Sequence, residues 1–220
     1  MPMKNLSIVP TANPDEDIAI FAENCVFMRS IYLHGQTLFD RSTADDKDRM
    51  ARTANTLFGD LSRMFVEYMI LQVCKITDPA KDARNNDNHT VAFLLQHYDF
   101  SADPATVSRL ASLADRLHAF RKKLIDARNK VISHADREAI RVGLPLGAAP
   151  DGDWNEFWLN LQDLVCIIHE KVLGVPFHVN GVAMLSDADG LLKALKHADC
   201  FNELLKDPAL TQRCADLALG

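Results

Sequence analysis

Residues that interrupt helices are scarce in this sequence, which has nine glycines and nine prolines among 220 residues. Runs of β-branched residues, which favour strands, are also few, whereas Ala, Leu, Asp and Lys are frequent. Because Gly and Pro destabilise helix interiors while Ala, Leu and Lys favour them, the composition predicts an all-α protein. The hydrophobic fraction of 48% and the charged fraction of 25% are ordinary for a globular domain.

Long hydrophobic runs are lacking as well, since no stretch of about 18 apolar residues occurs. The N-terminus has no apolar core before Pro10, so the sequence shows no signal peptide. The cysteines are odd in number, widely spaced and without a CxxC pair, which indicates buried free thiols; they are Cys25, Cys74, Cys166, Cys200 and Cys214. These features predict a cytoplasmic protein that does not enter a membrane.

Motifs for metals and nucleotides are also missing. The sequence has no HExxH, no CxxC and no glycine-rich phosphate loop, so we expect neither a metal nor a cofactor. The net charge of −6 argues against a protein that coats nucleic acid non-specifically. It leaves room for a local basic site.

Capping signals and apolar periodicity together predict the helices. Asn13 and Pro14 open the first, Pro79 stops the second, and Pro104 opens the third long one. Helices are expected over residues 14–35 or as far as 39, 45–78, 90–98, 104–134, 154–173, 186–198 and 200–217. Residues 141–153 are expected to form a loop, and residues 175–185 either a hairpin around Asn180-Gly181 or an extended loop.

This pattern suggests a flexible tail over residues 1–13, a helical domain over 14–175 and a C-terminal helical extension over 176–220 that packs on it. The second helix is expected to bury one stripe, made of Leu57, Leu61, Met64, Phe65, Tyr68 and Leu71. Residues 68–76 are apolar nearly all round, so they should be covered on every side, either in the centre of the bundle or in a subunit interface. Trp154 and Trp158 lie one turn apart, as core or interface anchors do, with base stacking as the alternative.

One segment carries the two side chains that metal-free RNA cleavage needs. Arg128-Asn129-Lys130-Val131-Ile132-Ser133-His134 lies at the end of the third long helix. Arginine can hold a phosphate, and histidine can move a proton near neutral pH. At 100° per residue, Arg121 and three leucines lie within about 40° of Arg128, namely Leu110, Leu117 and Leu124. Arg128 is therefore expected on the apolar face, where a guanidinium must be paired or line a cleft, and Asn129 on the solvated side.

His134 lies about 240° round an ideal helix from Arg128 and about 9 Å along it. The two side chains share a site only if the helix ends or bends between them, or if two subunits combine. The surrounding chain is basic: residues 116–137 contain seven Lys and Arg against two acids, a local charge of +5 that would attract phosphate.

The Arg–His spacing resembles the R-x(4–6)-H signature of HEPN domains, which are small all-α proteins common in bacterial toxins and anti-phage systems. The upstream segment, Leu71-Gln72-Val73-Cys74-Lys75-Ile76-Thr77-Asp78-Pro79, strengthens the resemblance. A long apolar helix that closes on Thr-Asp-Pro, followed by one that closes on Arg-Asn-Lys and Ser-His-Ala-Asp, is similar to the AbiU-type abortive-infection branch. The resemblance covers about residues 15–175 and implies an HEPN-like bundle of long antiparallel helices.

The resemblance also implies roles for the motif. His134 would act as acid or base on the RNA, Arg128 would stabilise the phosphoryl transition state, and Asn129 would position the histidine or the substrate. Arg121 and Lys130 would bind RNA. The partners implied are an RNA substrate, a second copy forming a homodimer with a composite cleft, and an antitoxin or regulator.

Three readings stay open at this stage. The first is a metal-independent ribonuclease of the toxin or abortive-infection type. The second is a non-catalytic HEPN-like module that binds RNA, a nucleotide or a protein. The third is a helical interaction protein in which Arg128 pairs with a buried acid and His134 caps a helix end. A shared Arg–His cleft in a dimer would separate the first two from the third, and loss of cleavage in His134→Ala would separate the first from the second.

Overall fold

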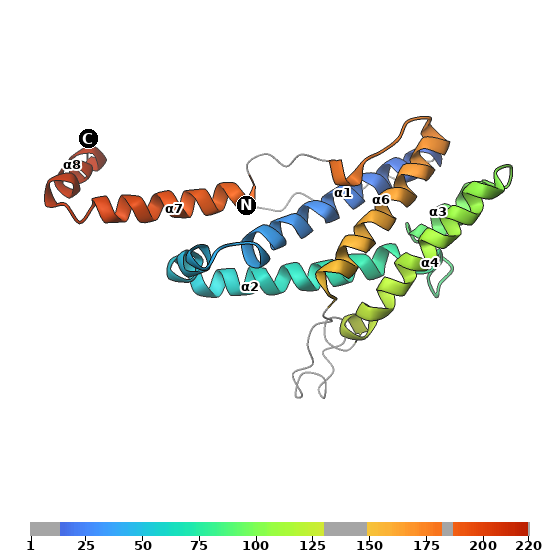
Figure 1. The fold of residues 1–220 in the computed structure, drawn as a ribbon, viewed down its shortest axis with the longest axis horizontal. Helices are drawn as coiled ribbons and strands as arrows, with labels where there is room; N and C mark the ends of the chain where they lie inside the picture. Colours follow the sequence, from blue (N-terminus) through green and yellow to red (C-terminus); the bar gives the residue numbers. More distant parts are fainter. Residues whose placement is uncertain (1–13, 130–148, 182–186, 220) are drawn as a thin grey trace. The chain divides into compact units, whose positions relative to one another are not determined.

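The computed structural model describes residues 14–129, 149–181 and 187–219, and these form an all-α structure as predicted. The α-helices are α1 (Pro14–Gly35), α2 (Ala44–Ile76), α3 (Val91–His97), α4 (Pro104–Ala127), α6 (Asp151–Leu173), α7 (Ala188–Leu204) and α8 (Pro208–Leu219) (Figure 1). A π turn, η1 (Gln36–Asp40), continues α1, and a 3-10 turn, η3 (Val179–Gly181), follows α6. Within these described ranges there is no strand, only an isolated bridge between Lys81 and Asp87.

Local capping explains where several helices begin and end. Thr90 caps α3, its hydroxyl accepting a hydrogen bond from Phe93 N at 3.2 Å, and Asp103 caps α4 in the same way through Thr106 N at 3.1 Å. Gly174 ends α6 in the left-handed conformation, with φ of 73°, which favours glycine. The predicted starts of α3 and α4 and the predicted end of α6 are thereby confirmed.

Three predicted boundaries differ from the structure. Helix α6 begins at Asp151, inside the segment expected to be a loop, whose residues 141–148 lie outside the described part. Helix α7 runs through Cys200 to Leu204, because no Gly or Pro interrupts it before Pro208. Residues 175–181 contain a 3-10 turn rather than a strand, and the remainder of the expected hairpin is not described.

The chain divides into two compact units, each made of two separate stretches. Unit 1 comprises Met1–Phe27 and Ile70–Val182, and unit 2 comprises Met28–Met69 and Ala183–Gly220. Both α1 and α2 contribute to both units. This division does not follow residue 175, and the predicted domain boundary there stays a prediction.

In unit 1, α4 and α6 pack side by side and antiparallel (Figure 1). Polar pairs join them along their length, and as the residue number rises along α4 its partner's number falls along α6. These pairs are Asp103–Lys171 at 2.9 Å, Arg109–Asp163 at 3.1 Å, Arg116–Asn160 at 3.4 Å and Lys123–Asp153 at 2.7 Å. Between them the rings of Phe120 and Phe157 lie 4.9 Å apart, and Trp158 is 1% exposed, so the predicted core role of Trp158 is confirmed.

In unit 2, a second core forms where η1, α2 and α7 meet. Leu38, Met50, Phe58 and Ala188 are buried together, with Phe39, Ala54, Leu61, Phe65, Leu192 and Leu195 packed against them. Helix α2 is kinked at Ala54, whose φ and ψ are −161° and 69°.

The buried stripe of α2 differs from the predicted one. Leu57 is 56% exposed and Met64 is 60% exposed, whereas Phe58 is buried, so these two residues of the predicted stripe face outward. Leu71 is 37% exposed in the single chain, so residues 68–76 are not covered on every side by this chain alone, and cover by a subunit interface stays a prediction. Met69, Ile70, Val73 and Cys74 in the same stretch are buried as expected.

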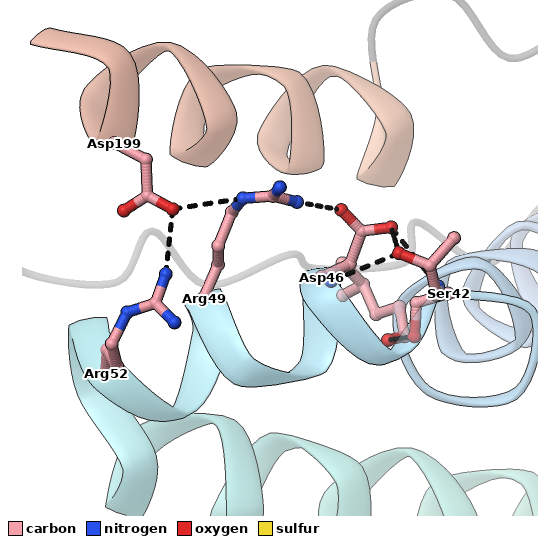
Figure 2. Close-up of polar contacts among 7 residues, drawn as sticks. Ser42, Asp46, Arg49, Arg52 and Asp199 are labelled. Atoms are coloured by element: carbon pink, nitrogen blue, oxygen red, sulfur yellow. Dashed lines mark hydrogen bonds and ion pairs between the residues drawn. The ribbon is translucent and has the colours of Figure 1, made fainter. Parts of the chain in front are cut away.

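An ion-pair network attaches α7 to the beginning of α2 (Figure 2). The Asp199 carboxylate of α7 accepts hydrogen bonds from Arg49 Nε at 3.0 Å and Arg52 Nη2 at 2.8 Å. Arg49 also reaches Asp46 at 2.7 Å, and the Asp46 carboxylate accepts a hydrogen bond from the Thr43 hydroxyl at 2.6 Å. One arginine thus bridges two acids from different helices.

No described helix is long and apolar enough to cross a membrane. The cysteines only partly match the expectation of buried thiols. Cys25 and Cys74 are buried, Cys166 is half-buried, and Cys200 is exposed on α7.

Candidate functional site

The candidate site lies at the C-terminal end of α4, where Arg128 follows directly on Ala127. Leu110, Leu117 and Leu124 are at most 2% exposed, which confirms the predicted apolar face of this helix. Arg128 is half-buried, as expected for a residue on that side. Its backbone N–H donates to the carbonyls of Leu124 and Ile125. The backbone of Arg128 and Asn129 is π-helical, a local widening that is frequent at functional sites.

Asn129 holds the Arg128 side chain. Its Oδ1 accepts a hydrogen bond from Arg128 Nη1 at 2.9 Å, and Asn129 is itself half-buried. Asn129, expected on the solvated side, is half-buried to a degree similar to Arg128, and its side chain turns toward the guanidinium. The contact restricts the guanidinium before any ligand arrives.

Arg121 lies on α4 seven residues before Arg128, and it forms an ion pair. Its Nη2 donates to Asp78 Oδ1, in the step that follows α2. The two side chains are 24% and 27% exposed, which makes this the least exposed Lys or Arg ion pair in the described part of unit 1. Arg121 Nε is buried and has no hydrogen-bond partner among the residues the structure describes.

The end of α2 supplies the wall beside these arginines. Thr77 is 1% exposed and its hydroxyl donates to Val73 O at 2.6 Å, which closes the last turn of the helix. Burial raises the pKa of the Cys74 thiol, and the positive charges of Arg121 and Arg128 act against that rise. Both guanidinium groups thus lie within electrostatic reach of Cys74. A buried thiol with a raised pKa is a poor nucleophile, so we assign Cys74 a packing role beside the two arginines.

His134 and Lys130 lie outside the described residues, so the structure brings Arg121, Arg128 and Asn129 together and leaves the other two predicted site residues without a position. Asp78 is the residue that sequence reasoning missed. An acid directly after an apolar helix end was visible, but its partner lies 43 residues away and local spacing cannot identify it.

The basic patch is partly neutralised within the described residues. Lys123 pairs with Asp153 at 2.7 Å, and Arg121 pairs with Asp78. Lys122 and Asp126 are exposed, as predicted. The positive potential at this end of α4 is therefore lower than the sequence charge of the segment indicates.

Elsewhere in unit 1, two histidines face one acid. His97 Nε2 lies 3.7 Å from Asp17 Oδ2, while His89 Nε2 donates to the Asp17 carbonyl at 2.8 Å. Phe93 stacks on the His97 ring, with centroids 5.0 Å apart. These contacts hold the start of α1 against α3. Within the described ranges no group of three or more His, Cys, Asp and Glu side chains has the arrangement of a metal site.

The family model HEPN_AbiU2, described as AbiU2, matches residues 19–175 of the chain. No curated protein and no solved structure matches this chain. The match covers most of the chain, including both helices that build the Arg121–Arg128 site, and it agrees with the all-α structure. The chain therefore belongs to the AbiU2 family of HEPN proteins, an abortive-infection-associated group.

Proposed function

We propose that the protein is a metal-independent endoribonuclease of the toxin or abortive-infection type. The single observation that supports this most directly is the half-buried Arg128 guanidinium at the end of α4, held by Asn129 beside the paired Arg121. A preorganised cation in a partly desolvated position stabilises a developing phosphoryl charge better than a freely hydrated one.

In the proposed reaction the RNA supplies its own nucleophile. The 2′-oxygen attacks the adjacent phosphorus in line, the bond to the 5′-oxygen of the next nucleotide breaks, and a 2′,3′-cyclic phosphate and a 5′-hydroxyl result. His134 acts as general acid or base on one of these oxygens, and Arg128 stabilises the charge on the phosphoryl oxygens. General acid–base help contributes about 10²–10⁴-fold in rate.

The active form in this proposal is a cytoplasmic homodimer, in which two Arg128–His134 motifs share one cleft and Lys130 and Arg121 line the RNA path. An antitoxin or regulator would restrain it. Lys122, which is exposed on α4, and Lys130 add positive charge to the sequence around Arg128, and this charge would attract RNA.

The test incubates wild type, Arg128→Ala and His134→Ala with a mixed RNA pool in EDTA, and then analyses the RNA ends. Cleavage by wild type alone, with cyclic phosphate ends, is the expected result. Lys47→Ala serves as a matched control, because it removes an exposed cation of α2 in unit 2. Equal cleavage by all four proteins would refute the assignment of both residues. Absence of cleavage with RNA binding retained would favour a non-catalytic RNA-binding module.

A further inference from the structure

Arg121 lies on the same face of α4 as Arg128, and its guanidinium forms an ion pair with Asp78. Seven residues separate the two arginines, so they lie within about 20° of each other round the helix and about 10 Å apart along it. That span exceeds the distance between adjacent phosphates of one RNA strand. The two side chains are thus placed to contact two phosphates of the strand that have one further phosphate between them.

Arg121 is not free to do so in this structure. Its Nη2 donates to the Asp78 carboxylate, which offers the same planar pair of anionic oxygens that a phosphate offers. Arg128, in contrast, has one hydrogen bond to a described residue, and that partner is the neutral Asn129 amide. Of these two guanidinium groups, only the one at position 121 carries an intramolecular counter-charge within the part of the chain that is described.

The pair remains accessible to an incoming anion. Arg121 is 24% exposed and Asp78 is 27% exposed, so a phosphate can approach the guanidinium without unfolding the end of α2. The buried Arg121 Nε has no hydrogen-bond partner among the described residues, which means that Asp78 does not satisfy every donor of the group. Because Nε is itself buried, an incoming phosphate must approach the part of the guanidinium that Asp78 now contacts.

We infer that Asp78 is a positioning residue of the Arg128 site, an internal substitute for phosphate that holds Arg121 and lowers the affinity of the site for RNA. This inference rests on the proposed function, because it deepens the account of the same site. RNA must displace the carboxylate or bind beside it, so Asp78 sets both how tightly and in which register the strand lies across the two arginines.

The test compares Asp78→Asn with Asp163→Asn. Both variants remove one acid that pairs with an arginine of α4, and both change the charge equally. Asp163 pairs with Arg109, which lies about 28 Å along the helix from Arg128. The probes are a single-stranded RNA oligomer and inorganic tripolyphosphate, measured over a series of salt concentrations.

Asp78→Asn is expected to bind the oligomer about five-fold more tightly than wild type at 0.1 M salt, and to steepen the salt dependence by about 0.7, the contribution of one further phosphate contact. Asp163→Asn should leave both quantities unchanged. Adding Arg121→Met to Asp78→Asn should abolish the gain, and Arg121→Gln serves where the Met variant does not fold. In cleavage, Asp78→Asn is expected to lower KM with little change in kcat.

The inference is overturned if Asp78→Asn binds neither probe more tightly than Asp163→Asn, or if the gain survives the loss of Arg121. Failure of the proposed function gives a different result. Tripolyphosphate would still show the Arg121-dependent gain, while no variant would bind or cut the RNA.

Discussion

Lys171 Nζ, in the last turn of α6, donates to the carboxylate of Asp103 at 2.9 Å, and Asp103 is the residue that caps α4. Hydrogen bonds from the Thr106 side chain, from Lys171 and from the Thr106 backbone hold the pKa of Asp103 well below its usual range. One carboxylate therefore starts α4 and joins it to α6.

Because of this depressed pKa, the folding stability of the protein depends on pH in the acidic range. A carboxyl group whose pKa is depressed in the folded state stabilises the protein fully above its unfolded pKa of about 3.9, and that contribution is lost as the pH falls further. The melting temperature of wild type should accordingly fall more steeply below pH 4 than that of Asp103→Asn. Asp99→Asn serves as a control, because Asp99 bonds locally to Ser101 without reaching another helix. Parallel pH profiles for wild type and Asp103→Asn would contradict the assignment.

Asn129→Ala should lower the cleavage rate of the proposed nuclease by about ten-fold. It removes the amide oxygen that accepts a hydrogen bond from the charged Arg128 guanidinium, so Arg128 is no longer held in place. Asn129→Asp keeps the acceptor for Arg128 but adds a negative charge, so it should weaken RNA binding more than Asn129→Ala does. Measuring kcat and KM separately checks both expectations. Equal effects of the two substitutions on KM would argue against Asn129 acting through Arg128.

Phe58→Ala should reduce the free energy of unfolding by about 3 kcal/mol, because it empties a site in the core of unit 2. Leu57→Ala, one residue earlier, should change it by less than about 0.5 kcal/mol, since Leu57 is exposed. Urea denaturation of the two variants measures the difference. A larger loss of stability in Leu57→Ala than in Phe58→Ala would instead support the buried stripe that periodicity predicts.

Asp199→Asn should loosen α7 from the start of α2, because Arg49 and Arg52 then lose the charge of their shared partner. Exposed and half-exposed ion pairs contribute about 1 kcal/mol or less, so faster hydrogen exchange in α7 is a better readout than global unfolding. Glu203→Gln is the matched control, since Glu203 pairs with Lys206 within the same segment. Unchanged exchange in Asp199→Asn would show that apolar packing alone attaches the helix.

The thiols should differ sharply in reactivity. Cys200 is exposed and should react first with Ellman's reagent, whereas burial raises the pKa of Cys25 and Cys74 and should protect both until the protein unfolds. The experiment uses a Cys214→Ser background, so that the signal comes from the other four cysteines. Rapid reaction of Cys74 in the folded protein would indicate that the wall beside Arg121 opens readily.

The parts of the fold that local signals govern could be read from the sequence. Thr90, Pro104 and Gly174 mark helix ends through contacts within one or two turns, and the leucine stripe of α4 has one apolar side. Helix α2 has apolar residues on more than one face, so periodicity alone could not choose between Leu57 and Phe58. The kink at Ala54 and the packing of α7 decide that choice.

The candidate site was predictable to the same extent. The face of Arg128 could be predicted because α4 is regular through Ala127, the residue before it. The hydrogen bond of Asn129 to Arg128 and the ion pair of Arg121 with Asp78 depend on side-chain contacts that helix periodicity does not describe. Neither feature leaves a local pattern.

The division of both units into separated stretches has a consequence for a chain growing on the ribosome. Helices α1 and α2 are made first, but α6, which packs on α4, ends at Leu173, and α7, which completes the core of unit 2, begins at Ala188. Domains generally fold as units during synthesis, so neither unit can close early. A ribosome that stalls before α6 has emerged leaves α4 without the helix that packs along it, and the length of translation thereby delays the assembly of the proposed nuclease site.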